Sequence, residues 1–215
     1  MAKTRTARRR KLRPASPQRV TRRRARELDP GDPVPIASWD GQTMTVQLPD
    51  PFVSDGRLPQ MAVGEVHELA PVLWMSCYSP ADVEESAWWC GALGTVAAVG
   101  SLVPPDPRSD LQVFLVDVAG RLFPLNWTNP EPFIADTIDL DGGLYLDPKL
   151  AEEGLLGASG DWCRRPYRVT DIRSYRRTAG VPRNPTSLSC TPATLQSRES
   201  LVVDLVDPEV SDRSP

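Results

Sequence analysis

The run of residues 93 to 127, LGTVAAVGSLVPPDPRSDLQVFLVDVAGRLFPLNW, contains three strand-like segments. A loop at 104 to 110 separates the first two, and a tight turn at Ala119 and Gly120 separates the last two. The middle segment, 111 to 118, is apolar at successive positions, which is typical of a strand covered on both faces. The sequence therefore predicts a mainly β fold with this meander at its centre.

Further strands are expected on both sides of the meander. Before it, TMTVQL at 43 to 48 reads as a strand, and 61 to 76 reads as extended structure broken near Pro71. After it we expect a loop that leads into a short strand at 143 to 146, and then a basic strand at 166 to 175. The apolar run LVVDLV at 201 to 206 can return to the sheet or can add a strand to a partner's sheet.

Two short helices are also predicted. The first begins with Ser79 as N-cap and Pro80 at the first helical position, and Gly91 would end it. Trp88 and Trp89 would anchor this helix on the core. The second helix, 148 to 155, would have Asp147 as its N-cap.

The order of elements from 93 to 175 resembles an oligonucleotide-binding (OB) barrel. GTVAAVGSLV would be the first strand, LQVFLVDVAG and RLFPLNW a hairpin, and YRVTDIRSY the closing strand. The helix at 148 to 155 departs from this pattern, because OB barrels place a helix before the fourth strand and this one would follow it. The expected fold is thus a small OB-like β-barrel or a sandwich, with two short helices, a disordered basic N-terminal arm and a Pro/Ser-rich C-terminal tail.

These elements divide the 215 residues into three parts. Residues 1 to 30 would be a disordered Arg-rich arm, 31 to 177 a β-rich globular domain, and 178 to 215 a linker with an acidic-apolar tail. No segment approaches the ~18 uninterrupted apolar residues of a membrane span. The basic start is not followed by the apolar run of roughly 7–15 residues that a secretory signal contains. We therefore expect a cytoplasmic protein with no membrane partner, and the preference for arginine over lysine indicates a GC-rich bacterial genome.

Charge is separated along the chain. Residues 1 to 26 hold 12 of the 25 Lys and Arg and none of the 28 Asp and Glu. The arm thus carries +12, and the rest of the chain, with 13 bases, carries −15. Six of these 13 bases lie in RRPYRVTDIRSYRR at 164 to 177, where Asp171 is the one acid.

These two basic segments predict a nucleic-acid partner, DNA or RNA. Arginine pairs with phosphate, and each neutralised phosphate releases condensed counterions. Two-residue alternation in the second segment would place its tyrosines on one face with arginines, an arrangement that can stack bases. The candidate binding residues are Arg8, Arg9, Arg10, Lys11, Arg13, Arg22, Arg23, Arg24, Arg26, Arg165, Tyr167, Arg168, Arg173, Tyr175, Arg176 and Arg177.

Other interpretations of both segments remain open. The arm could be a solvated tail, or could dock an acidic protein surface in a larger assembly. The strand at 166 to 175 could be an edge strand whose arginines pair with the acidic body and whose tyrosines cover the core. The alternative function is therefore that of an interaction or structural protein.

Catalytic and metal-binding signatures are weak. The only histidine, His67, lies in GEVHEL between two glutamates, and no GxSxG or nucleotide-binding loop is present. The four cysteines have no CxxC spacing, so we expect reduced, buried thiols without zinc. A metal-dependent enzyme would have to assemble its site from Asp117, Asp136, Asp139 and Asp141. We predict no catalytic residue, no metal and no cofactor.

Overall fold

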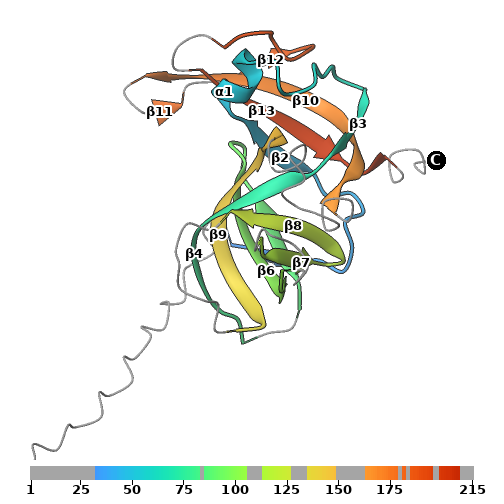
Figure 1. The fold of residues 1–215 in the computed structure, drawn as a ribbon, viewed down its shortest axis with the longest axis vertical. Helices are drawn as coiled ribbons and strands as arrows, with labels where there is room; N and C mark the ends of the chain where they lie inside the picture. Colours follow the sequence, from blue (N-terminus) through green and yellow to red (C-terminus); the bar gives the residue numbers. More distant parts are fainter. Residues whose placement is uncertain are drawn as a thin grey trace, which may run out of the picture.

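The structure is a computed structural model that describes residues 32–82, 85–105, 113–126, 135–148, 163–178, 181–182, 185–195 and 199–208. These residues form thirteen connected strands and one short helix. The strands make two parts, a barrel and a curved sheet beside it (Figure 1).

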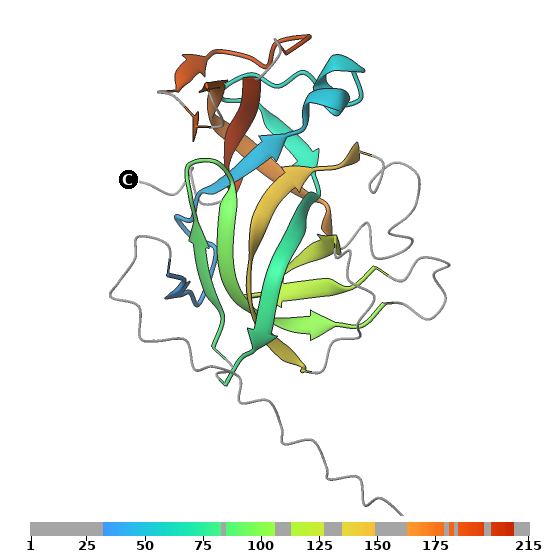
Figure 2. The same cartoon turned by 90° about the vertical axis from the view of Figure 1, so that its left-hand side faces the viewer.

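Five strands close into a barrel by pairing in a ring. In ring order, β6 pairs with β7, β7 with β8, β8 with β4, β4 with β9, and β9 again with β6. The β8–β4 pairing is parallel and the other four are antiparallel. Figure 2 shows β4 and β9 side by side at the front of the barrel. The barrel strands are β4 (Pro71–Pro80), β6 (Thr95–Val103), β7 (Leu115–Val118), β8 (Arg121–Asn126) and β9 (Thr137–Leu146).

The second part is a sheet in which β2, β13, β10 and β3 lie in that order, all antiparallel. It joins the barrel where Gln47 of β2 pairs with Tyr145 of β9, and where β3 leads directly into β4. The short strands β11 and β12 also pair with β10. These strands are β2 (Met44–Leu48), β3 (Val66–Leu69), β10 (Arg165–Thr178), β11 (Val181–Pro182), β12 (Thr186–Leu188) and β13 (Glu199–Val206).

Three short elements complete the described fold. The strand β5 (Ala87–Cys90) pairs with β6, and β1 (Val34–Pro35) pairs with β5. The helix α1 (Asp50–Ser54) follows Pro49 and has Pro51 in its first turn, where a missing N–H costs no hydrogen bond.

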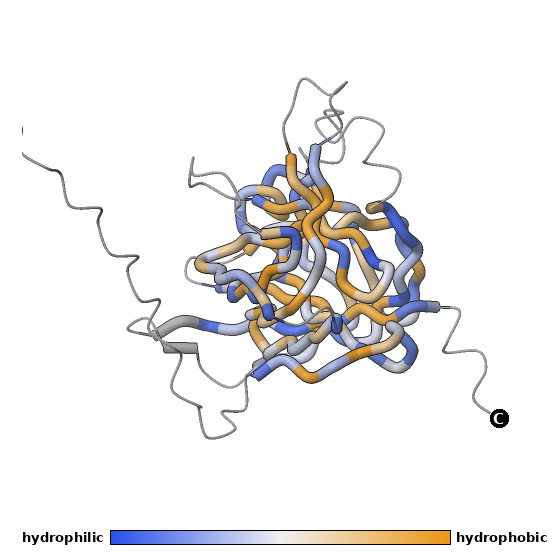
Figure 3. Tube along the Cα trace, turned by 90° about the horizontal axis from the view of Figure 1, so that it is seen from below, coloured by the Kyte–Doolittle hydropathy of each residue, from blue (hydrophilic) through white to orange (hydrophobic). Residues whose placement is uncertain are grey.

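The core follows the two-residue period of the strands. In β9, Ile138, Leu140 and Leu144 are at most 1% exposed, while Asp139 and Asp141 between them are half-buried. Figure 3 shows hydrophobic and hydrophilic stretches mixed along the whole Cα trace. One continuous hydrophobic cluster extends from the barrel into the second sheet, so the two parts share a core.

The predicted meander is confirmed. Its three segments form β6, β7 and β8, and the turn lies at Ala119 and Gly120. Both turn residues have positive φ, 50° and 78°, which is the backbone of a two-residue type I′ hairpin. Asp117 Oδ1 accepts a hydrogen bond from the Gly120 N–H at 2.7 Å and fixes the turn. The strand at 43 to 48 and the return of 201 to 206 to the sheet are also confirmed.

The first predicted helix is wrong. Ser79 and Pro80 end β4, and Trp88 and Trp89 lie in β5. Trp88 is 2% exposed because its ring stacks on Phe123, with the ring centroids 5.4 Å apart. Helix caps are each worth only about 1 kcal/mol, whereas the strand conformation pairs β5 with two neighbours and buries Trp88. The second predicted helix, apart from its first residue, lies outside the described residues.

The barrel closes with a different strand from the one expected. The strand expected at 166 to 175 is part of β10, which spans 165–178 and lies in the second sheet. The closing position between β8 and β9 belongs to β4, the first of the barrel strands in the chain. The expected loop before 143 is also wrong, because β9 begins at Thr137. The alternation of Ile138 and Leu140 with aspartates in TIDLDGG suits a strand.

Several expectations concern the ends of the chain and the thiols. β11, β12 and β13 follow residue 177, where we expected the globular domain to end, and β13 pairs with both β10 and β2. Residues 1 to 31 lie outside the described part. Within that part, no helix is long and apolar enough to cross a membrane.

All four cysteines are unpaired; Cys163 is buried and Cys90 half-buried, whereas Cys77 and Cys190 are exposed.

Candidate nucleic-acid interface

The two tyrosines of β10 point away from solvent. Tyr167 is 1% exposed and Tyr175 is 6% exposed, so neither ring presents a face on which a base can stack. The expected common face is interrupted by a β-bulge between Val169 and Asp171, after which Ile172 takes the buried position. The structure thus agrees with the interpretation in which these tyrosines cover the core.

Arg173 belongs to an internal ion-pair cluster. Its Nη2 donates to Asp204 Oδ1 of β13, and its Nε lies 3.3 Å from Asp171 Oδ2. Thr45 Oγ1 of β2 donates to the same Asp204 oxygen at 2.6 Å. The Tyr175 hydroxyl accepts from Arg173 Nη1 at 3.4 Å and donates to the carbonyl oxygen of Ala92 at 3.3 Å. The Arg173 charge is therefore compensated within the protein.

The other β10 arginines do not gather in one groove. Arg165 and Arg176 are exposed and Arg168 is half-buried. At about 3.3 Å per residue, the eleven positions from Arg165 to Arg176 separate the two exposed charges by roughly 36 Å along the strand. The side chain of Arg177 and the nine candidate residues of the arm lie outside the described part of the chain.

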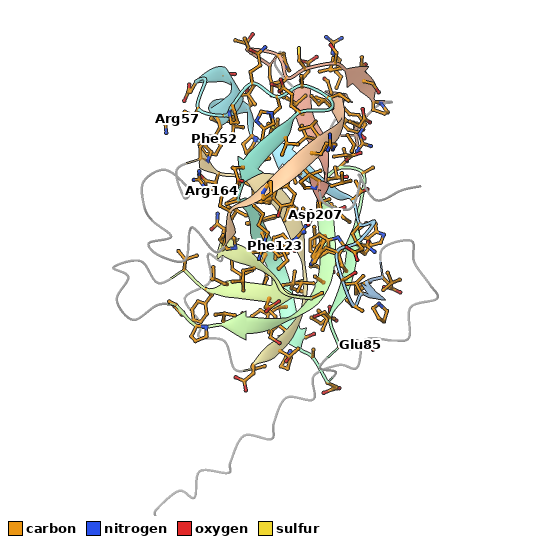
Figure 4. The ribbon with its side chains drawn as sticks, turned by 90° about the vertical axis from the view of Figure 1, so that its right-hand side faces the viewer. Phe52, Arg57, Glu85, Phe123, Arg164 and Asp207 are labelled. Atoms are coloured by element: carbon orange, nitrogen blue, oxygen red, sulfur yellow. The ribbon has the colours of Figure 1, made fainter. Side chains whose placement is uncertain are left out.

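Next to Tyr167 lies a buried arginine that is not among the candidate residues from the sequence. Arg121 of β8 is 6% exposed, and its Nη2 is 3.0 Å from Asp207 Oδ2. Its guanidinium carbon lies 4.4 Å from the ring centroid of Trp39 and 5.3 Å from that of Tyr167. Burial raises the pKa of Tyr167 to about 12, although Arg121 opposes this shift. Figure 4 shows Phe123 and Asp207 in this region, between barrel and sheet.

The only exposed aromatic side chain among the large hydrophobic residues of the described ranges is Trp74 of β4, at 48%. It lines a pocket of about 400 Å³ at the junction of barrel and second sheet. Segments far apart in the sequence contribute to this pocket: Gln47 from the end of β2, Phe52 from α1, Trp74 from β4, Asn126 from β8, and Gly143, Tyr145 and Asp147 from β9 and the residue after it.

Local features of β4 and β9 open this pocket. A β-bulge between Met75 and Cys77 directly follows Trp74, and bulges re-aim neighbouring side chains. Trp74 pairs across the strands with Gly143, where a Cβ atom would lie 3.9 Å from Trp74 Cε3. The indole ring thus lies beside bare backbone. The GG pair after TIDLD is the one sequence signal that could have located this site.

A second pocket, of about 390 Å³, adjoins the first and shares Asp147 with it. Its charged lining consists of two cations and two anions, Arg57, Arg164, Glu68 and Asp147. Figure 4 shows Phe52, Arg57 and Arg164 on the same side of the molecule.

His67 and the aspartates considered for a metal-dependent enzyme do not form a metal site within the described residues. His67 lies on β3 with its Nε2 3.1 Å from Glu65 Oε2, as expected for a partly exposed strand histidine. Within the described residues, no group of three His, Cys, Asp or Glu side chains is arranged to hold a metal ion. Comparison with protein-family models, curated proteins and solved structures gave no match for this chain.

Proposed function

We propose that the protein is a non-enzymatic nucleic-acid-associated protein whose Arg-rich arm, residues 1 to 26, binds the phosphate backbone. The observation that carries the proposal is the separation of +12 in the arm from −15 in the rest of the chain. The state of the second basic segment supports it: Arg173 is compensated by Asp204 and Asp171, and the two exposed β10 arginines lie far apart. The arm is then the concentrated source of positive charge, and it would give strong, salt-dependent binding.

The barrel topology is compatible with this role. With β6, β7 and β8 as the first three strands and β9 as the fourth, β4 takes the position of the closing strand, so we propose a circularly permuted OB-like barrel. OB barrels bind oligonucleotides and oligosaccharides, but a fold alone does not specify a function. The topology therefore adds support that is secondary to the charge.

We propose the cytoplasm as the compartment. All four cysteines are unpaired, and two of them are exposed. Reducing compartments keep such thiols from forming disulfides.

The test measures binding of the full chain to duplex DNA and to RNA over a range of salt concentrations. Replacing Arg22, Arg23 and Arg24 together by glutamine should reduce the slope of log affinity against log salt by roughly 3, because each phosphate contact on duplex DNA contributes about 0.9. The matched control replaces by glutamine three exposed arginines outside the arm, Arg57, Arg165 and Arg176. It should change the slope of log affinity against log salt little.

Two results would overturn the proposal. One is binding that does not respond to salt. The other is an equal loss of slope in the arm variant and the body variant. If the protein stays in its cellular complexes after nuclease treatment, the arm docks an acidic protein surface instead.

A further inference from the structure

The pocket beside Trp74 has no role in backbone binding by the arm. Four large hydrophobic side chains are substantially exposed in the described ranges: Val34, Val63, Val66 and Trp74. The three valines contribute to no pocket described above, whereas Trp74 forms part of the wall of a pocket of about 400 Å³. An exposed indole in the wall of a pocket is apolar surface that a ligand can cover.

The walls of this pocket are suited to a flat ligand. Three aromatic side chains contribute to it, namely Trp74, Phe52 and Tyr145. Gly143 leaves space beside the Trp74 ring, and Gly142 allows β9 to approach the Trp74 backbone more closely than any side chain would permit. A planar group can therefore lie on the indole face.

The polar groups at the rim can bind the edge of such a ligand. Asn126 Nδ2 donates to the Tyr145 hydroxyl at 2.6 Å, and Gln47 Nε2 donates to the carbonyl oxygen of Leu93 at 2.7 Å. These bonds hold the side-chain amides of Asn126 and Gln47 in place. Each amide can offer its carbonyl oxygen to a ligand as an acceptor. The Tyr145 hydroxyl accepts from Asn126 and retains its own hydrogen as a donor. The pocket thus combines a stacking surface with acceptors and a donor.

This combination matches a nucleobase better than a phosphate. Bases have flat faces that stack on aromatic side chains, and donors and acceptors along one edge. The adjoining pocket holds two cations and two anions, so it offers no net positive charge to a phosphate. In a duplex both base faces are stacked, which restricts the ligand to a single strand.

We propose that the Trp74 pocket binds one unstacked base of a single-stranded nucleic acid, with the base on the Trp74 indole and its polar edge toward Gln47, Asn126 and Tyr145. This inference rests on the proposed function, in which the arm supplies backbone affinity. The pocket then makes the protein prefer single strands, a preference that the arm alone does not provide.

The experiment uses the full chain and a labelled 12-nucleotide single strand, alone and as a duplex with its complement, at raised salt where the arm contributes less. Trp74→Ala should weaken single-strand binding about tenfold or more and leave duplex binding unchanged. Trp74→Phe should retain most of the single-strand affinity. The matched control is Val66→Ala, since Val66 of β3 is also 48% exposed and should have no effect.

The outcomes separate this inference from the proposed function. The pocket assignment is overturned if binding depends on salt but Trp74→Ala does not change it, or if Trp74→Ala weakens the binding of single strand and duplex equally. The proposed role of the arm then still holds. Binding that never responds to salt overturns both. A neutral oligosaccharide that displaces the single strand from the wild-type protein identifies a sugar site and also overturns the assignment.

Discussion

At the scale of single residues, Arg121 connects the barrel to the second sheet. It lies on β8 of the barrel, while Asp207 follows β13 and Tyr167 lies on β10. A buried guanidinium keeps its charge, so it needs an anionic partner and polarisable neighbours. Asp207 supplies the anion, and the rings of Trp39 and Tyr167 supply the neighbours. This contact joins segments more than 80 positions apart in the sequence.

Removing the anion should therefore destabilise the protein. Asp207→Asn leaves the Arg121 charge buried without its ion pair, and we expect the free energy of unfolding to fall by about 2 kcal/mol. Urea unfolding measures the loss. The control is Arg57→Gln, whose partner Asp55 lies 4.0 Å away at the surface, and which should cost less than about 1 kcal/mol. Equal losses for the two variants would contradict a structural role for the Arg121 contact.

At the scale of elements, local sequence predicted those strands whose signals are local. The turn at Ala119 and Gly120 and the apolar run before it locate β7 and β8, because a hairpin pairs neighbours in the chain. The prediction of a helix from 79 to 90 was wrong for the opposite reason. Good helix caps compete there with pairing to β6 and with an aromatic cluster formed by Trp39, Trp88 and Phe123. Distant partners decide that segment, and a single sequence does not identify them.

The two adjacent glycines of β9 should respond differently to a methyl group. A Cβ at Gly142 would lie 1.9 Å from the backbone oxygen of Trp74, which a strand cannot relieve without moving, so Gly142→Ala should lower the free energy of unfolding by about 2 to 3 kcal/mol. A Cβ at Gly143 meets nothing closer than 3.4 Å, so Gly143→Ala should cost less than about 1 kcal/mol. Thermal unfolding of the two variants makes the comparison. Similar stabilities would show that β4 and β9 lie further apart than described.

At the scale of the whole molecule, the sequence predicted the charge separation but not where the second basic segment would lie. Its arginines and tyrosines alternate in the sequence, yet both tyrosines are buried and a bulge interrupts the expected common face. Asp204 of β13 and Asp171 compensate Arg173. The Trp74 pocket could not be predicted either, because its walls come from β2, α1, β4, β8 and β9. Both outcomes depend on the ring order in which β4, the first barrel strand in the chain, closes the barrel between β8 and β9.

Buried thiols and a buried tyrosine should also give the protein a characteristic sensitivity to alkaline pH. Burial raises the pKa of Cys90 and of Cys163 from 9.0 to about 11, and that of Tyr167 from 10.0 to about 12. The folded state therefore holds these protons more tightly than the unfolded chain. The stability that this provides is complete below about pH 9 and is lost as the pH rises toward about 11 for the thiols and about 12 for Tyr167.

We expect the free energy of unfolding to fall steadily above pH 9. Cys90, whose pKa burial raises from 9.0 to about 11, should contribute up to roughly 3 kcal/mol of this loss. Urea unfolding at a series of pH values measures this slope. Cys90→Ala should flatten the slope between about pH 9 and 11, whatever it does to stability at neutral pH, because the titrating group is removed. Cys190→Ala, at an exposed thiol, should keep the wild-type slope. If Cys90→Ala also keeps it, the contact of Cys90 with Thr45 is open to water, and the junction of β2 and β5 is looser than its hydrogen bonds imply.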